Sequence, residues 1–538
     1  MKYSEEKKIY YGGSIITMED EFPYVEALVV EGQKIIDLGK LQEIREKYNK
    51  NSIEIDLKGN TLLPGFIDSH IHPFGYMFYL HSLDLFNLRS LEELLRVLEE
   101  SAEKKNLDEL VLGLRLNEEN FKDPKLPTRW DLDKACPNHP VFLLRYDGHI
   151  GVANSKTLEL IKIKDKIKSI EGAEARKNKE GEFTGVLSEN AIGLITPLIK
   201  APKDQELSKM VEGMCESLAE MGITSIHGLI QLDDESGVLN FGENEMKLLR
   251  LSREHVIQDV YAFLFTNFPD KLNNIKDMKP FNEKEEGVIK LAGLKLFSDG
   301  SFGGATAAMF EPFEDQPDKI GFIVEDVEKI YQKMEKAHLN NFQIAIHAIG
   351  DKANREVTNL YQKLLKKHPR EDHRHRIEHA SILTEDTIKD IKDLGLVVSF
   401  QPQFINSEYT WLEKRLGSKR CERTYPVKTL IDSGVIICSG SDSPVEMPNV
   451  IKGLHALVTR NGFQPQECIS MWDALKTFTI NAAYASFQEQ LKGTLSPGKY
   501  ADLVILDKNP LEIKNDKIKE IKVLETIKRG KTVFKKIG

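Results

Sequence analysis

The stretch Leu62-Leu63-Pro64-Gly65-Phe66-Ile67-Asp68-Ser69-His70-Ile71-His72 is an apolar, strand-like run that ends in two histidines separated by one residue. Successive side chains of a strand point to opposite faces, so His70 and His72 point the same way and could bind one metal ion together. Two histidines at a strand end are also common as ordinary polar residues. The pair therefore predicts a metal site only if further ligands meet it in space.

Further apolar runs end in residues that can ligate a metal or carry a proton. These runs are residues 294–300, 343–351, 375–380 and 436–443, and they contain Lys295, His347, His379 and Asp442. Each run has the length of a buried parallel strand, and helical patterns fill the gaps between them. In a parallel α/β barrel all strand ends meet at one face. The pattern thus predicts a TIM-like (β/α)8 barrel whose distant polar residues share one pocket.

The count of strands does not fit a plain barrel. Ten apolar runs lie near residues 62, 110, 142, 223, 258, 291, 343, 376, 396 and 435, whereas the barrel needs eight strands. The stretches 117–133 and 169–183 are polar and rich in turn residues. We therefore expect an insertion at about residues 115–200 over the barrel mouth. It could shape the substrate pocket or be a plain surface elaboration.

Five ordered motifs and two terminal ones resemble the amidohydrolase superfamily over nearly the whole chain. The terminal motifs are the opening Gly12-Gly13-Ser14-Ile15-Ile16-Thr17-Met18 and the closing Gly493-Thr494-Leu495-Ser496-Pro497-Gly498-Lys499-Tyr500-Ala501-Asp502-Leu503-Val504. Within the superfamily, the chain resembles amidohydrolase family 3, the branch of the YtcJ-like proteins and N-substituted formamide deformylase. This resemblance implies an α/β metal-dependent hydrolase.

Both ends of the chain have short alternating segments typical of β-hairpins, such as residues 27–38 and 501–506. The resemblance implies that residues 1–61 and 485–538 fold together into a small β-sandwich. The barrel domain would then occupy residues 62–484, inserted between the two parts of this composite domain.

The resemblance also implies roles for the polar strand ends. His70 and His72 would hold a first metal ion with Asp442 beside it, and His347 and His379 would hold a second. Imidazole and carboxylate suit Zn²⁺, which is our first choice, but manganese, iron and nickel fit the same ligand types. We expect one or two divalent ions per chain.

Lys295 needs a separate explanation, because an ammonium group cannot ligate a cation. In the resembled family, a lysine in this place reacts with carbon dioxide to form a carbamate, a bridging anion. The alternative is a lysine that forms an ion pair with Asp299 or another carboxylate.

These roles predict hydrolysis of a carbon–nitrogen bond in an amide or N-substituted formamide of a small organic molecule. Water shared between two metal ions has its pKa lowered to about 7 and becomes a nucleophile at neutral pH. Asp442 would take its proton and deliver it to the leaving nitrogen. Two alternatives stay open, namely a deaminase of an amino-substituted heterocycle and a catalytically silent binding protein.

Several other residues are candidates for the pocket. His149, in Arg145-Tyr146-Asp147-Gly148-His149, would orient the substrate or stabilise an oxyanion, or else be a structural histidine. His227 is a weaker candidate of the same kind. Asp299 and Gln403 would fix the orientation of metal ligands. Candidates for an apolar substrate wall, with core packing as the alternative, are Phe302, Phe404 and Trp411. Strand alternation places Arg376 and Glu378 on the side away from His379, as a structural ion pair.

Composition limits the remaining classes of function. The 538 residues carry a net charge of −10 that is spread along the chain, which argues against nucleic acid as a partner. No apolar segment resembles a signal peptide or a membrane span, so we expect a cytoplasmic protein with a small-molecule substrate. The five cysteines show no metal or redox spacing. A homodimer stays open.

Overall fold

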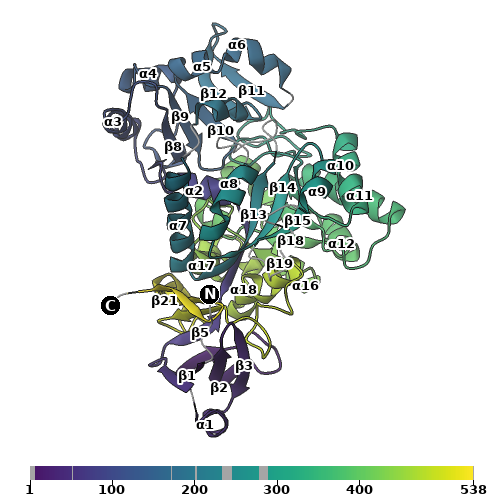
Figure 1. The fold of residues 1–538 in the computed structure, drawn as a ribbon. Helices are drawn as coiled ribbons and strands as arrows, with labels where there is room; N and C mark the ends of the chain where they lie inside the picture. The colour runs from purple at the N-terminus through teal and green to yellow at the C-terminus, as the bar shows by residue number, and fades with distance from the viewer. Residues whose placement is uncertain are drawn as a thin grey trace.

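The computed structural model describes residues 6–50, 52–170, 172–199, 203–232, 245–277, 281 and 289–536. These residues form three sheets that follow one another along the length of the molecule (Figure 1). A sheet built from both chain ends lies at the bottom of the view, the barrel lies in the middle, and a six-stranded sheet lies at the top.

The central sheet is a nearly closed barrel of eight parallel strands in the order β19-β18-β17-β16-β15-β14-β13-β6. The strands are β6 (Phe66–Ile71), β13 (Ile223–Gln231), β14 (Asp259–Phe265), β15 (Ile289–Phe297), β16 (Gln343–Ala348), β17 (Arg376–His379), β18 (Val397–Phe400) and β19 (Ile437–Ser439). A parallel bridge between Ile71 and Ser443 connects the two edges. The predicted TIM-like barrel is therefore confirmed.

Helices follow the barrel strands along the chain, and several of them cover the outside of the barrel (Figure 1). They are α2 (Pro73–Tyr79), α7 (Asp204–Glu220), α8 (Glu245–Ser252), α9 (Asp270–Ile275), α10 (Val327–Leu339), α11 (Asp351–Lys367), α12 (Glu385–Asp393), α13 (Gln403–Glu408), α14 (Leu412–Leu416), α15 (Ser418–Cys421), α16 (Val427–Asp432), α17 (Val450–Thr459), α18 (Met471–Thr477) and α19 (Ile480–Ala485). In α11, for example, Val357, Leu360, Tyr361 and Leu364 are buried. Their spacing of three or four residues puts them on the one face that packs against the barrel.

The two surplus strand candidates, near residues 110 and 142, belong to the six-stranded sheet over the barrel mouth (Figure 1). Its strands are β7 (Leu83–Asp84), β8 (Val111–Leu116), β9 (Val141–Arg145), β10 (Ile150–Ala153), β11 (Ala173–Lys177) and β12 (Phe183–Glu189). The helices α3 (Leu91–Ala102), α4 (Arg129–Ala135), α5 (Ser155–Leu160) and α6 (Ile163–Lys166) accompany it. This sheet begins at Leu83, before the polar stretches that indicated an insertion.

Both chain ends contribute to the third sheet, which mixes parallel and antiparallel pairs. Its strands are β1 (Lys7–Ile16), β2 (Tyr24–Glu31), β3 (Lys34–Gly39), β4 (Ser52–Asp56), β5 (Thr61–Pro64), β20 (Leu503–Leu506), β21 (Val523–Lys528) and β22 (Lys531–Lys535), and helix α1 (Leu41–Lys47) packs on it. The pairing of β20 with β5 joins the two ends of the chain. Gly65 connects β5 to β6, and a Cβ at this position would lie 2.4 Å from Cγ2 of Thr224. The close approach of Thr224 therefore requires glycine between the two strands.

A buried ionic cluster fastens this sheet to the barrel. Lys528 Nζ lies 2.8 Å from Oδ2 of Asp259 on β14 and 2.7 Å from Oδ2 of Asp502. Lys492 also pairs with Asp259. Burial alone would raise the pKa of Asp259, but the two lysines hold it below its usual range. The ionised carboxylate is therefore the stable form in the folded protein.

Asp259→Asn should lower the free energy of unfolding by about 3 to 5 kcal/mol, because it removes one of the two carboxylates that pair with the buried ammonium groups of Lys492 and Lys528. The stabilisation that ionised Asp259 contributes is complete above a pKa of about 3.9, the value of aspartate in the unfolded chain. It is lost as the pH falls toward the lower pKa of Asp259 in the folded protein. Urea unfolding at pH 7 and pH 3 measures both effects. Asp270→Asn, at an exposed ion pair with Lys336, is the control. Equal midpoints for Asp259→Asn and wild type at pH 7 would contradict this assignment.

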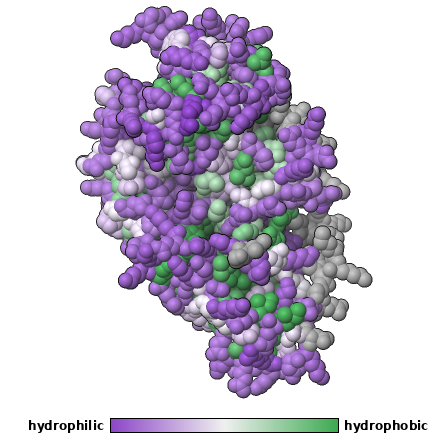
Figure 2. Space-filling model, turned by 90° about the vertical axis from the view of Figure 1, so that its left-hand side faces the viewer, coloured by the Kyte–Doolittle hydropathy of each residue, from purple (hydrophilic) through white to green (hydrophobic). Residues whose placement is uncertain are grey.

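Hydrophilic residues dominate the face of the molecule in Figure 2, and the apolar residues on it lie in small separate patches. Among the described residues, no helix combines the length and the apolar character that crossing a membrane requires.

Candidate functional site

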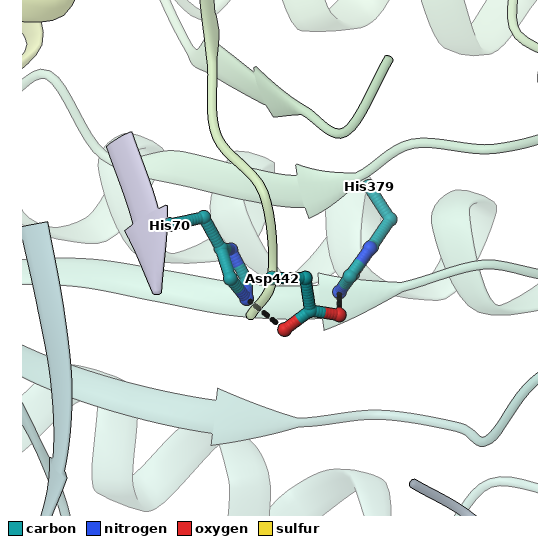
Figure 3. Close-up of side chains that lie close together, drawn as sticks. All are labelled: His70, His379 and Asp442. Carbon is teal, nitrogen blue, oxygen red and sulfur yellow. Dashed lines mark ion pairs between the residues drawn. The ribbon is translucent and has the colours of Figure 1, made fainter. Parts of the chain in front are cut away.

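Three potential metal ligands meet at the ends of three barrel strands. His70 belongs to β6, His379 ends β17, and Asp442 follows β19. Their side chains point toward one another (Figure 3), with His70 Nε2 at 3.2 Å from Asp442 Oδ1 and His379 Nε2 at 4.0 Å from Asp442 Oδ2. One ligand atom from each residue lies within 4.8 Å of the other two, and all three residues are buried. A divalent cation fits this arrangement.

All six residues predicted to bind metal line one cavity of about 600 Å³, which includes its open mouth. His72 Nε2 lies 3.3 Å from Asp442 Oδ1, on the same side as His70. The ring of His347 lies 4.4 Å from that of His379, and His347 Nε2 lies 3.1 Å from the carbonyl oxygen of Gly300. Burial lowers the pKa of both His347 and His379 well below the usual range. Both imidazoles are therefore neutral, as metal ligands must be.

Lys295 lies on β15 and is 1% exposed, and its Nζ has no hydrogen-bond partner in the described part of the chain. Burial lowers its pKa to about 8. The predicted alternative partner, Asp299, instead accepts hydrogen bonds from the backbone N–H groups of Ala308, Ile349 and Gly350, at 2.9, 3.0 and 2.8 Å. The structure thus contains no Lys295–Asp299 pair among these residues.

Glu378 has a position that strand alternation did not predict. His379 has a φ of 73°, a left-handed value that interrupts the alternation at the end of β17. Glu378 faces inward, where its Oε2 contacts Nδ1 of His70, while Ile377 packs in the hydrophobic core. The left-handed backbone at His379 lets this neighbouring side chain reach the cavity on the same inner side. The expected ion pair exists, with Arg376 Nε at 2.8 Å from Glu378 Oε1. The prediction that this pair faces away from the metal ligands was wrong.

The contact with Glu378 fixes the orientation of the His70 ring. Because Nδ1 faces the carboxylate, Nε2 is the nitrogen directed at Asp442. Burial opposes ionisation of Glu378, but Arg376 holds its pKa well below the usual range. Arg376 also contacts Nδ1 of His227 at 2.9 Å. His227 therefore contacts the structural ion pair, and it is not among the described residues that line the cavity.

His149 reaches the cavity from the six-stranded sheet. Its ring lies 5.5 Å from that of His347, and its Nδ1 lies 2.8 Å from Oε2 of Glu189 at the end of β12. Burial opposes protonation, but Glu189 raises the pKa of His149 to about 9. Asp147 holds the same loop in place by accepting from Ser301 Oγ at 2.9 Å. The insertion therefore shapes the pocket, which was one of the two alternatives.

The other predicted pocket residues lie outside the described lining of this cavity. Phe302 is 2% exposed within the hydrophobic core, the Gln403 amide donates to the carbonyl of Met447, and Asp299 is occupied by backbone N–H groups. Phe404 stacks on His379, with ring centroids 5.8 Å apart, and it lines an adjoining cavity together with His149, His347 and Asp442. Trp411 donates from Nε1 to the Ser407 carbonyl at 3.0 Å.

Sequence reasoning missed five apolar and two polar residues that line the cavity. The missed residues are Leu229, Ile230, Gln231, Glu245, Phe265, Phe297 and Val445. Five of them are the last residues of their strands and have no distinctive motif of their own, namely Leu229, Ile230, Gln231, Phe265 and Phe297. The one available signal was therefore their place at the carboxyl end of a barrel strand.

Comparisons with known proteins identify the family of this chain. A family model described as amidohydrolase family matches residues 54–534. The chain is 28% identical to the putative amidohydrolase YtcJ of Bacillus subtilis, over 98% of this chain and all of YtcJ. It is 24% identical to the N-substituted formamide deformylase of Arthrobacter pascens, over 98% of each protein.

A solved structure has the same fold. The crystal structure of an uncharacterized metal-dependent hydrolase from Pyrococcus horikoshii superposes with a TM-score of 0.74 at 26% identity, covering 95% of this chain and 99% of that one. A family match over most of the chain, a shared barrel and a buried His/His/Asp cluster lead to one conclusion. This protein belongs to the amidohydrolase family and is a metal-dependent hydrolase of that superfamily.

Proposed function

We propose that the protein hydrolyses the carbon–nitrogen bond of an amide or N-substituted formamide of a small organic molecule. Four histidines, one aspartate and a lysine without a hydrogen-bond partner among the described residues converge on a single cavity, and this convergence carries the proposal. The full-length similarity to an N-substituted formamide deformylase supports the choice of bond.

The residues present fit a divalent ion, for which Zn²⁺ is our choice. His379 Nδ1 and Lys295 Nζ are both buried without a hydrogen-bond partner among the described residues. We propose that His70, His72 and Asp442 hold one ion, and that His347 and His379 hold a second, with Lys295 as a bridging carbamate. When bound, such an ion polarises a carbonyl and lowers the pKa of water.

Asp442 is the proposed proton shuttle. Its carboxylate lies between the three histidines and borders the cavity, so it can take a proton from an attacking water and pass it to the leaving nitrogen. Glu378 keeps the His70 ring fixed while this happens. His149 reaches the same cavity with a raised pKa, and it would donate a hydrogen bond to the substrate carbonyl oxygen as negative charge develops there.

A turnover screen tests this function. Metal-loaded protein of known metal content is offered N-substituted formamides, N-acyl amines and cyclic amides, and the released amine is measured. Release of formate and amine from formamides is the expected result. Failure to cleave any of these classes, with full metal content, would refute the proposal.

Deamination of an amino-substituted heterocycle is a second candidate, because the compact His70, His379 and Asp442 group by itself fits one metal ion. Release of ammonia from amino-heterocycles by protein holding a single ion would favour this activity over the first.

Lys295→Ala should lose most of its bound metal and its turnover, because the bridging anion is missing. Short carboxylic acids such as acetate should restore part of both, since they supply a carboxylate in the vacated space. Metal analysis and turnover with increasing acetate measure this. Lys290→Ala, on the same strand and outside the cavity lining, is the control. Full metal content in Lys295→Ala without acetate would rule out the bridging role.

A further inference from the structure

One sector of the cavity carries no proposed metal ligand. It is formed by the carboxyl ends of β13 and β14 and by the start of α8, and its lining residues are Leu229, Ile230, Gln231, Phe265 and Glu245. Four strands or their following loops, β6, β16, β17 and β19, supply the proposed histidine and aspartate ligands elsewhere around the barrel. A substrate with its scissile bond at the metal ligands has this sector available for its remaining part.

Strand register shows that the sector is continuous with the metal ligands. Gln231 is paired with Phe265, Phe265 with Lys295, and Phe297 with His347. The rings of Phe265 and Phe297 lie 4.7 Å apart at 87°, and Phe297 lies 5.2 Å from the ring of His347. Two perpendicular aromatic rings therefore connect the proposed reaction centre to the β13 side of the cavity.

Glu245 is the one ionisable residue among the described residues that line this sector. It is 5% exposed, and its Oε2 accepts a hydrogen bond from the backbone N–H of Gln231 at 2.6 Å. No cation of the described chain forms an ion pair with it. A buried carboxylate without a counter-ion is costly, and for this reason burial raises the pKa of Glu245 to about 8. A cationic group entering the cavity would remove this cost.

We propose that the substrate carries an apolar or aromatic N-substituent that ends in a cation, an ammonium or guanidinium group, and that Glu245 binds this cation. The apolar part would lie along Leu229, Ile230 and the two phenylalanines, whose ring faces also attract cations. This inference rests on the proposed hydrolysis of a carbon–nitrogen bond and adds the class of substrate.

Binding measured without turnover tests the role of Glu245. Benzylguanidinium and benzylurea have nearly the same shape, but one is a cation and the other is neutral. Calorimetry on metal-loaded wild-type protein should show the cation binding roughly tenfold tighter or more, as expected of a hydrogen bond to a charged group. Glu245→Gln should remove this preference. Glu328→Gln, which changes an exposed carboxylate on α10, should keep it.

Proton release gives a second readout. Because the Glu245 carboxyl is mostly neutral at pH 7 before binding, the wild type should release protons when benzylguanidinium binds, and Glu245→Gln should not. Titrations in two buffers of different ionisation enthalpy measure this. Equal affinity for the cation and the urea in the wild type, or a cation preference that survives in Glu245→Gln, would overturn the inference.

A kinetic comparison separates this inference from the proposed function. The ratio of kcat/KM for N-(4-aminomethylbenzyl)formamide over N-(4-methylbenzyl)formamide should exceed one in the wild type and fall in Glu245→Gln. If neither formamide is cleaved while the Glu245-dependent binding preference holds, the proposed bond is wrong and the cation site stands. If both are cleaved with a ratio that Glu245→Gln leaves unchanged, the cation site is wrong and the proposed function stands.

Discussion

Asp442→Asn should lower turnover by a factor of about 10² to 10⁴ or more, because general acid and base catalysis usually contributes a factor of this size. Asparagine has nearly the shape of aspartate, and the Asp442 backbone N–H would still donate to the His70 carbonyl, at 2.7 Å in the wild type. The fold should therefore persist while the proton acceptor is removed. Steady-state kinetics on a cleaved formamide, with metal content measured in the same sample, gives the result.

Asp68→Asn is a matched control for this variant. Asp68 is also buried, but its Oδ1 accepts hydrogen bonds from the backbone N–H groups of His70 and Ser441, which an asparagine oxygen can accept equally well. It should keep most of the wild-type turnover. A near wild-type rate in Asp442→Asn would mean that another group moves the proton.

His70→Ala and His379→Ala should lose bound metal and, with it, all metal-dependent turnover. Each removes one imidazole from the group that surrounds Asp442. Glu378→Gln should have a smaller effect, a loss of about 10-fold to 100-fold in metal affinity or activity, because it removes only the group that orients His70. Metal titration with a competing chelator measures all three variants.

His81→Ala serves as the control for the histidine variants. His81 contacts the Met77 carbonyl at 3.0 Å and is not part of the cavity lining. It should bind metal as the wild type does. Wild-type metal affinity in both His70→Ala and His379→Ala would exclude these residues as ligands.

The barrel could be predicted because its strands are buried on both faces and therefore form nearly continuous apolar runs. The same property explains why two extra strands were counted. β8 and β9 are also buried and pair in parallel, so locally they look like barrel strands. Only their pairing partners, which depend on the whole fold, place them in the sheet over the mouth.

The proposed metal ligands could be predicted because they lie at the ends of apolar strand-like runs. Residues whose position depends on backbone geometry or on burial could not be predicted. The positive φ of His379 places its side chain on the same inner side as that of Glu378, and a positive φ at a non-glycine residue cannot be inferred from its neighbours. Glu189 and Glu245 are single carboxylates whose roles depend on partners that are distant in sequence. Phe302 lies within the glycine-rich stretch 300–304 and is buried in the core, so its aromatic character gave no information on the pocket.

The central claim is that divalent metal, bound by His70, His72 and Asp442 and by His347 and His379, is required for hydrolysis. Its most direct test is to measure metal content and formamide turnover on the same sample before chelation, after chelation, and after addition of Zn²⁺. We predict one to two ions per chain in the active protein, loss of turnover in step with loss of metal, and recovery of both with Zn²⁺. Full turnover by the metal-free protein would contradict this account.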